Sequence, residues 1–420
     1  MQTFHEQTNI TLKKYYSEPT FIDYTTQPKT TKHYPHFFRR FFLDDYPTLT
    51  FIKNIGKITY TKTYGNDSIS LRTNPSAGGL YPCEVYIQIR GMKGFISGIY
   101  HYEPLANALV LIHELTQDGI EAYSSNPNKQ EKFIFMISCA YFRTTWKYEK
   151  RSIRYLLLDC GHQLGSIYAA LCLEGKEADF NVDFDLKKLN ELFGFEGFEF
   201  FLSGIKSELH KSIETKALRT PLVHVAACDY QIREPFVEAF YQKSLEKSNQ
   251  TFEKVSLLND FTKNQLAQAI DSRRSVRAFK KASILYDEVT FILKNIIEFA
   301  AAFGIELYMI NNHIMGLEQG LYKNVTLIKR GNFEEKATHL ALNQMLAGKA
   351  ALTLIFTANE NSNYTQSSLL CGFIAHIIYL RSAKLNIGCS AIGAYFDEEC
   401  QKFLETKNNI LYLLSIGKEV

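Results

Sequence analysis

The apolar segment Phe133-Ile-Phe-Met-Ile-Ser138 decides the fold, because a matching segment, Leu352-Thr-Leu-Ile-Phe-Thr357, occurs in the second half of the chain. Both are short runs rich in β-branched and aromatic residues, which predicts a buried strand. Gly94-Phe-Ile-Ser-Gly-Ile-Tyr100 precedes the first run, and Gly316-Leu-Glu-Gln-Gly-Leu-Tyr322 precedes the second. The order of these segments is the same in both halves, which indicates a duplicated domain.

The segments that follow the two strands also correspond. A long helical pattern spans Tyr155–Leu173 in the first half and Ser367–Ala383 in the second. Each pattern leads to an expected short strand and an acidic helix start, within Phe180–Asp185 and within Ala391–Asp397. Strands that alternate with long helices indicate an α+β or α/β architecture.

The repeat predicts two domains, at residues 1–241 and 251–420. The polar stretch Gln242–Gln250 is the expected linker, because exposed polar segments with few contacts usually separate domains. A chain of 420 residues is long enough for two such domains.

Composition excludes several classes of protein. The net charge is only +3, which argues against nucleic acid as a partner. No run of 18 apolar residues predicts a membrane span, and the N-terminus has no apolar core of a signal peptide. The eight cysteines are scattered without a C-x-x-C pair, which predicts reduced core thiols in a cytoplasmic protein and no metal site.

The two halves differ in three segments that carry reactive side chains. The first half has Leu71-Arg-Thr-Asn-Pro-Ser-Ala-Gly-Gly-Leu-Tyr-Pro82 and an insertion around Trp146-Lys-Tyr-Glu-Lys-Arg151, and neither has a counterpart in the second half. The second half has Asp271-Ser-Arg-Arg-Ser-Val-Arg277, which the first half lacks. The differences are therefore complementary.

The arginine-rich segment suits a phosphate group. In an extended backbone, Arg273, Ser275 and Arg277 point to one side and present two guanidinium groups and a hydroxyl. This donor set matches a phosphate monoester. The alternative is a solvated basic turn whose arginines face the carbonyl groups at the end of the preceding helix.

The two segments of the first half have functional and structural interpretations. Asn74-Pro-Ser-Ala-Gly-Gly79 predicts a turn that a ligand can approach closely, although its spacing does not fit a dinucleotide-binding loop. Lys147 and Tyr148 pair an amine with a phenol and could transfer a proton. The alternative for this pair is the exposed start of an amphipathic helix.

Together these segments resemble the FMN-dependent nitroreductase-like superfamily, and within it the SagB-type branch that oxidises azolines in peptides. The resemblance is carried by residues 72–82, Gly98-Ile-Tyr-His-Tyr102, Trp146-Lys-Tyr148, Arg273-Arg-Ser-Val-Arg277 and Gly388-Cys-Ser-Ala-Ile-Gly-Ala-Tyr395. It implies an α+β fold in which helices flank a central, mostly antiparallel sheet. Members of the superfamily are ordinarily homodimers, so the duplication implies a pseudo-dimer within one chain.

The resemblance also implies a cofactor and its contacts. FMN would place its phosphate on Arg273, Ser275 and Arg277, and Ile392 and Gly393 would lie under its ring system. Pro75, Ser76 and Ala77 would close the site from the other domain. Because Phe51-Ile-Lys-Asn-Ile-Gly56 does not supply a second phosphate segment, one FMN per chain is expected.

The branch implies the reaction. Lys147 and Tyr148 match a Lys-Tyr pair that azoline-oxidising members use for catalysis, so they would remove a proton from a thiazoline or oxazoline ring while hydride passes to FMN. The partners would be a peptide substrate and, in the same pathway, a cyclodehydratase and a precursor peptide. Two alternatives stay open: an NAD(P)H-dependent nitro- or quinone reductase, and a non-catalytic scaffold with the same fold.

Overall fold

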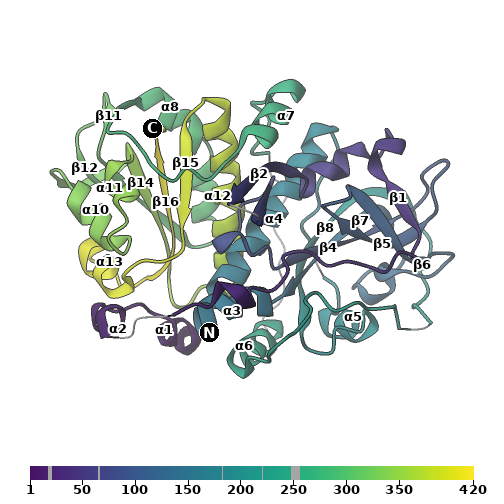
Figure 1. The fold of residues 1–420 in the computed structure, drawn as a ribbon. Coiled ribbons are helices and arrows are strands. Elements are labelled where there is room, and N and C mark those ends of the chain that lie inside the picture. The colour runs from purple at the N-terminus through teal and green to yellow at the C-terminus, as the bar shows by residue number, and fades with distance from the viewer. Residues whose placement is uncertain (18–20, 65–66, 182, 220, 247–255) are drawn as a thin grey trace. The chain divides into compact units, whose positions relative to one another are not determined.

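The computed structural model describes residues 1–17, 21–64, 67–181, 183–219, 221–246 and 256–420 (Figure 1). These residues form two compact units. The first unit is Asp23–Leu258, and the second unit is Asn259–Val420 together with Met1–Ile22.

The first unit is built on a six-stranded sheet in the order β1-β6-β5-β4-β7-β8, in which every pairing is antiparallel. A separate hairpin, β2-β3, leads into the Pro-Ser-Ala-Gly-Gly turn. The strands are β1 (Arg40–Phe42), β2 (Ile58–Tyr64), β3 (Asp67–Arg72), β4 (Cys83–Ile89), β5 (Gly98–Glu103), β6 (Ala108–Glu114), β7 (Gln130–Ala140) and β8 (Glu199–Lys211). The α-helices are α3 (Phe142–Tyr148), α4 (Ser152–Leu173), α5 (Leu186–Leu192) and α6 (Pro235–Leu245). Short 3-10 helices are η1 (Tyr24–Thr26), η2 (Leu43–Asp45), η3 (Thr50–Ile55), η4 (Ala77–Gly79), η5 (Ile120–Tyr123) and η6 (Glu149–Arg151).

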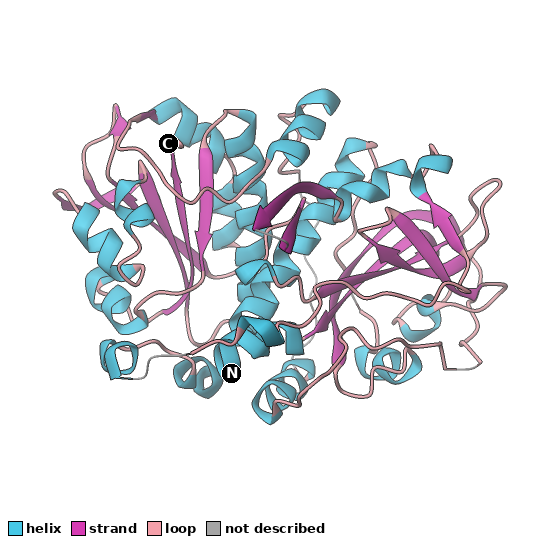
Figure 2. Cartoon of the chain, in the orientation of Figure 1, coloured by secondary structure: helices cyan, strands magenta, loops and turns pink. Residues whose placement is uncertain are grey.

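The second unit has a six-stranded antiparallel sheet in the order β13-β12-β10-β14-β16-β15, and a two-stranded parallel pair, β9-β11. The sheet lies between α12 on one side and α10, α11 and α13 on the other (Figures 1 and 2). Its strands are β9 (Ile284–Leu285), β10 (Ile305–Asn311), β11 (Ile314–Met315), β12 (Gly320–Lys323), β13 (Thr326–Arg330), β14 (Leu352–Ala358), β15 (Gly388–Ile392) and β16 (Asn409–Gly417). Its helices are α1 (Gln2–Gln7), α2 (Leu12–Ser17), α7 (Lys263–Ser272), α8 (Tyr286–Leu293), α9 (Ile296–Ala301), α10 (Glu334–Leu340), α11 (Met345–Lys349), α12 (Tyr364–Lys384) and α13 (Asp397–Leu404).

Five strands of each sheet share one order. In the first unit these strands are β6-β5-β4-β7-β8, and in the second unit they are β13-β12-β10-β14-β16. The sixth strands differ, since β1 pairs with β6 at one edge of the first sheet and β15 pairs with β16 at the opposite edge of the second. In both units the long helix, α4 or α12, follows the fourth of the five strands in the chain. The predicted α+β class with mostly antiparallel sheets is therefore confirmed, and the shared order of five strands agrees with a duplication.

The predicted division of the chain differs from the structure at both ends of the first domain. Met1–Ile22 packs with the second unit, where Ile10 N donates to Asp397 Oδ2 at 2.9 Å and His5 Nδ1 lies 3.1 Å from Tyr364 Oη. Of the predicted linker, residues 242–245 continue helix α6, and residues 247–250 lie outside the described residues.

The predicted strand within Phe180–Asp185 is wrong for the residues that the structure describes. Only a single bridge, between Asp179 and Lys206, joins this segment to β8. The corresponding strand of the second unit, β15, does form and pairs with β16 along its whole length. The acidic helix starts are present in both units, since Asp185 accepts a hydrogen bond from Lys188 N at the start of α5 and α13 begins at Asp397.

The cysteines and the most apolar helix lie mainly in the interior of the structure. All eight cysteines are free thiols, and seven of them are buried. One helical stretch, Phe142–Leu173, is long and apolar enough to cross a membrane, but 89% of its most apolar window is buried within the structure. Core helices have this property, so the stretch does not indicate a membrane protein.

Candidate active site

The Pro-Ser-Ala-Gly-Gly turn of the first unit is anchored to helix α4 by a carboxylate. Ser76 Oγ donates to Asp159 Oδ2 at 2.5 Å, and Ala77 N donates to Asp159 Oδ1 at 3.1 Å. The Ser76 hydroxyl also accepts a hydrogen bond from Tyr81 N at 2.9 Å, which closes the turn on itself. Asp159 is only 4% exposed, and burial raises its pKa to about 7, although the bonds from Ser76 and Ala77 oppose this shift.

Lys147 and Tyr148 lie directly beside this turn. Gly78 has a φ of +64°, a left-handed conformation that favours glycine. A Cβ atom at this position would lie 2.8 Å from Tyr148 Oη and 3.4 Å from Lys147 Cδ. The structure therefore brings together two segments of the first half that are far apart in the sequence and absent from the second half.

The Lys-Tyr pair ends a short helix rather than starting one. Helix α3 stops at Tyr148, and both side chains are half-buried. Lys147 Nζ donates to Tyr24 Oη at 3.4 Å and lies 5.3 Å from the centre of the Tyr24 ring. The Tyr148 ring contacts the Tyr155 ring of α4, with 4.4 Å between their centroids. The exposed helix start that was the alternative for this pair is therefore not what the structure shows.

A buried charge network fixes the start of α3 through Arg143. Arg143 Nη1 lies 2.7 Å from Glu84 Oε1 of β4 and donates to the Tyr81 carbonyl at 2.7 Å. Glu84 also pairs with His101 Nε2 at 2.8 Å and accepts from Lys32 N at 3.1 Å. Burial raises the pKa of Glu84, but Arg143 and His101 outweigh it and hold the pKa well below its usual range. The network therefore joins helix α3, the end of the turn and the sheet.

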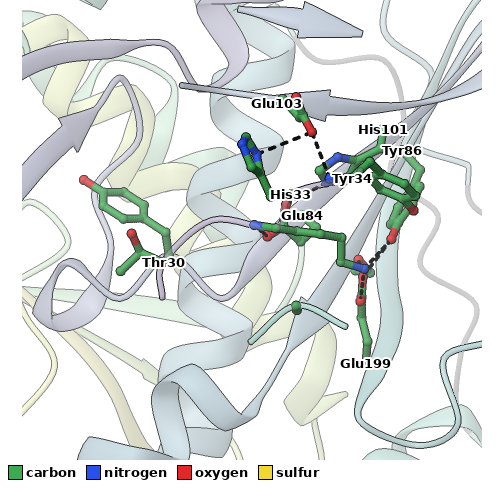
Figure 3. Close-up of polar contacts among 12 residues, drawn as sticks. Thr30, His33, Tyr34, Glu84, Tyr86, His101, Glu103 and Glu199 are labelled. Carbon is green, nitrogen blue, oxygen red and sulfur yellow. Dashed lines mark hydrogen bonds and ion pairs between the residues drawn. The ribbon is translucent and has the colours of Figure 1, made fainter. Parts of the chain in front are cut away.

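The same network anchors the segment before β1. The Lys32 ammonium group lies 2.5 Å from Glu199 Oε2 and donates to Tyr86 Oη at 2.7 Å. Glu103 accepts from Tyr34 N at 3.0 Å (Figure 3). It also pairs with Arg40 at 2.9 Å. These buried charges are matched by partners of opposite sign, which is the arrangement of a structural support.

In the second unit, Arg273 and Ser275 meet at one side chain of helix α12. The Arg273 guanidinium carbon lies 5.4 Å from the centre of the Tyr379 ring, and Ser275 Oγ lies 2.9 Å from Tyr379 Oη. Arg273 is buried and Ser275 is half-buried. Burial raises the pKa of Tyr379 to about 12, so its hydroxyl stays protonated near neutral pH. Arg273 and Ser275 therefore both contact Tyr379, and the predicted alignment of all three residues stays a prediction.

The two remaining arginines of the segment behave differently. Arg277 is exposed. Arg274 donates to the carbonyl groups of Asp271 at 2.9 Å and Arg273 at 2.6 Å, at the end of helix α7. The alternative interpretation of this segment, in which arginines face helix-end carbonyls, thus applies to Arg274.

Strand β15 brings the Ile392–Gly393 segment to the same tyrosine. Ala391 N donates to Tyr379 Oη at 2.7 Å, and Val276 N donates to the Cys389 carbonyl at 3.0 Å. A cavity of about 240 Å³ lies alongside, lined by Ser272, Arg273, Arg274, Val276, Tyr379, Ala383, Asn386, Ile387, Gly388, Cys389 and Glu419. Of the three predicted phosphate contacts, Arg273 lines this cavity, and Ser275 and Arg277 do not. The donor types of the segment, two guanidinium groups and a hydroxyl, are those that suit a phosphate monoester.

The sequence analysis did not identify Asp159 or Tyr379. Asp159 had a recognisable signal, because it is a carboxylate in the otherwise apolar stretch Leu156-Leu-Leu-Asp-Cys160. Tyr379 had none, since an aromatic residue in an apolar helix normally belongs to the core. Both residues link two segments that the sequence analysis did identify.

Part of the chain is similar in sequence to known nitroreductases. Residues 270–418 match the sequence profile of the nitroreductase family. A protein of Methanocaldococcus jannaschii, provisionally named a nitroreductase, is 26% identical over 189 residues, which are 39% of this chain and 96% of that protein. An FMN-dependent nitroreductase of Clostridium difficile is 17% identical and covers 36% of this chain and 87% of its own, with a TM-score of 0.27.

A solved structure resembles the chain over its whole length. The crystal structure of an Anabaena variabilis protein, provisionally named a nitroreductase, covers 100% of this chain and 99% of its own, with a TM-score of 0.80 and 19% identity. The chain therefore has the nitroreductase-like fold of that protein, and residues 270–418 are similar in sequence to the nitroreductase family.

Proposed function

We propose that this protein is an FMN-dependent dehydrogenase that oxidises thiazoline or oxazoline rings in a peptide to azoles. The similarity to the nitroreductase family supports an oxidoreductase, and members of that family are typically FMN-dependent. The observation that carries the substrate class is the contact between the turn at Gly78 and the side chains of Lys147 and Tyr148. A proton-transfer pair beside a turn that would cover the flavin suits this reaction, because the ring must lose a proton while hydride passes to the flavin.

The cofactor contacts form part of the same proposal. Arg273, Ser275 and Arg277 would hold the FMN phosphate, and Ile392 and Gly393 would lie under the ring system. The buried position of Arg273 supports this role, because a charge-assisted bond to phosphate is stronger where water is excluded. Pro75, Ser76 and Ala77 would close the site, and the two units, which share the order of five strands, would act as the two subunits of a pseudo-dimer with one FMN.

The chemistry of the chain's own residues follows from their positions. Oxidation of an azoline removes two hydrogens from the ring, one as a proton and one as hydride. When bound, FMN supplies the hydride acceptor. Lys147, as the neutral amine, would take the proton from the ring carbon and become an ammonium group, and the Tyr24 hydroxyl would orient that amine through the 3.4 Å hydrogen bond. The Tyr148 hydroxyl, held against the turn, would orient or relay the proton.

The proposed substrate and pathway partners of the protein are those that the family resemblance implies. A peptide that carries an azoline would be the substrate, and a cyclodehydratase acting on a precursor peptide would form that azoline. The reaction needs this earlier step because the ring must exist before it can be oxidised.

An anaerobic reduction experiment tests the proposal. The purified protein is expected to show a flavin spectrum, and a synthetic peptide with one thiazoline is expected to bleach it. Bleaching by NADPH without bleaching by the peptide would favour a nitro- or quinone reductase. Protein that cannot be loaded with FMN would favour a non-catalytic scaffold.

A further inference from the structure

We propose that Asp159 is a positioning residue that holds the turn at Ser76–Tyr81 against Lys147 and Tyr148 and so sets the geometry of the proton-transfer pair. The inference deepens the proposed function, because it concerns the pair to which that function assigns catalysis. It rests on contacts within the first unit alone.

The Asp159 carboxylate holds the turn in place through two hydrogen bonds. One of its oxygens accepts from the Ser76 hydroxyl at 2.5 Å, and the other accepts from Ala77 N at 3.1 Å. Because the Ser76 hydroxyl in turn accepts from Tyr81 N at 2.9 Å, a single side chain of α4 fixes both ends of the turn. An ionised carboxylate accepts from two donors at once, which a protonated one does less well.

The surroundings of Asp159 make a purely structural role costly. It is buried at 4% exposure, and the titratable groups that act on it or respond to it are the thiols of Cys83 on β4, Cys139 on β7 and Cys160 on α4. No cation is among the causes that shift its titration, which are burial and the bonds from Ser76 and Ala77. A buried carboxylate without a cation destabilises the fold, so its benefit must lie in what it holds.

The turn transmits this constraint to the Lys-Tyr pair. Gly78, next to Ala77, approaches so closely that a Cβ atom would lie 2.8 Å from Tyr148 Oη. Arg143 at the start of α3 binds the Tyr81 carbonyl at 2.7 Å, so the far end of the turn is tied to the helix that carries the pair. Close-packed groups of this kind move together, and release of the turn should therefore displace Tyr148 and Lys147.

The fluorescence of Trp146 can report whether a change at Asp159 moves helix α3. Trp146 is the only tryptophan, and it precedes Lys147 in α3. Its indole N–H donates to Thr26 Oγ1 at 2.9 Å. Because the carboxyl group titrates near neutral pH, the fluorescence of the purified protein is expected to change across the neutral range with a midpoint near the pKa of about 7.

Two variants separate Asp159 from the histidines, which titrate in the same range. Asp159→Asn keeps every histidine and the shape of the side chain, and it should abolish the transition. Ser76→Ala removes the bond that lowers the pKa of Asp159, so it should move the midpoint upward. A wild-type protein without the transition, an Asp159→Asn variant that retains it, or an unmoved midpoint in Ser76→Ala would overturn the proposal.

An activity measurement gives the second readout. With the thiazoline peptide as substrate, Asp159→Asn should lower kcat by about 10–100-fold and change KM by less than about threefold, because a displaced catalytic pair loses rate rather than binding. An unchanged kcat would contradict the positioning role. If the wild-type protein oxidises no thiazoline peptide, the proposed function fails, and the fluorescence titration still decides the role of Asp159.

Discussion

Gly78 and Tyr148 approach each other so closely that a methyl group on the Gly78 Cα would lie 2.8 Å from the Tyr148 hydroxyl oxygen. Residue 78 therefore meets two requirements that only glycine satisfies together, a left-handed backbone and a missing side chain. The contact connects the two segments of the first half that have no counterpart in the second. Through this contact, the conformation of the turn determines where the Tyr148 hydroxyl lies.

Gly78→Ala should displace the Lys-Tyr pair. We expect the rate of azoline oxidation to fall by about 10–100-fold, because small displacements of catalytic groups have effects of this size. Gly79→Ala is the matched control, since its φ is +68° and a Cβ atom there would meet nothing within 4 Å. Both variants bear the strain of a left-handed alanine, so steady-state rates that are equally reduced in the two would contradict the contact argument.

A second substitution should relieve the clash at Gly78. Tyr148→Phe removes the oxygen that the new methyl group would meet, so the double variant Gly78→Ala with Tyr148→Phe should have a higher thermal midpoint than Gly78→Ala alone. Adding Tyr148→Phe to Gly79→Ala should give no such recovery. Non-additive midpoints confined to the first pair would locate the interaction, and additive midpoints in both pairs would count against it.

Loss of the two arginines should remove the cofactor. Arg273→Ala combined with Arg277→Ala deletes charge-assisted bonds worth about 1.5–3 kcal/mol each, so the folded protein should purify colourless. Arg330→Ala is the matched control, because the Arg330 side chain on β13 is 77% exposed and does not line the cavity beside this segment, so its loss should leave the flavin in place. A fully yellow double variant, or two flavins per wild-type chain, would refute the phosphate assignment.

Glu84→Gln should destabilise the first unit. It leaves Arg143 buried without its ion-pair partner, which typically costs about 3–5 kcal/mol and should lower the thermal midpoint by roughly 10 °C. Asp229→Asn is the control, since the Lys29–Asp229 pair is 68% and 66% exposed and should contribute little. Equal midpoints for Glu84→Gln and the wild type would show that the buried network is not the support described here.

The Glu84 carboxyl also predicts acid sensitivity. Its pKa is lower in the folded protein than its ordinary value of 4.5, so the stability that it contributes is present above that value and is lost as the pH falls through the folded pKa. The thermal midpoint of the wild type should therefore fall on acidification more steeply than that of Glu84→Gln. Parallel acid profiles would contradict this origin.

Asp159 has the opposite linkage. Burial raises its pKa from 3.8 to about 7, so the folded state binds a proton that the unfolded state releases, and stability falls as the pH rises between these values. The difference is on the order of 4 kcal/mol if the whole shift is realised. Asp159→Asn should therefore become relatively more stable than the wild type above neutral pH, as thermal midpoints at acidic and alkaline pH can show.

Hydrophobic periodicity in the sequence predicted the strands and helices whose formation depends on neighbouring residues in the chain. The apolar runs at β7 and β14 and the long helices α4 and α12 follow from hydrophobic periodicity and length. The segment around Phe180 alternates like a strand, but only Asp179 pairs with β8. Alternation of apolar and polar residues shows that a segment could form a half-buried strand. It does not show that a neighbouring strand is available to pair with that segment.

The site depended on contacts that sequence spacing does not reveal. Nothing in the spacing places Gly78 against Tyr148, or Tyr379 between Ser275 and Ala391, because each set of residues meets only through the tertiary packing within its own unit. The N-terminal residues are similar, since Asp397 binds Ile10 across nearly the whole length of the chain. The site residues were predicted from the family resemblance and from the chemistry of their side chains. The residues that surround them could be identified only in the structure.

The central claim is that Lys147 and Tyr148 transfer a proton beside a bound flavin. Lys147→Ala and Tyr148→Phe should retain FMN, because neither residue belongs to the proposed phosphate segment. Lys150→Ala is the matched control, since this exposed lysine belongs to the same insertion and packs over the Phe236 ring. The flavin spectrum of each variant shows whether it is folded and loaded.

The most direct measurement is therefore the single-turnover rate at which a peptide with one thiazoline reduces the flavin of each loaded variant. Lys147→Ala and Tyr148→Phe are predicted to slow this step by about 10²–10⁴-fold, while Lys150→Ala reduces flavin at the wild-type rate. Rates within about twofold of the wild type in both variants, well short of the factor expected for a proton-transfer group, would contradict the assignment.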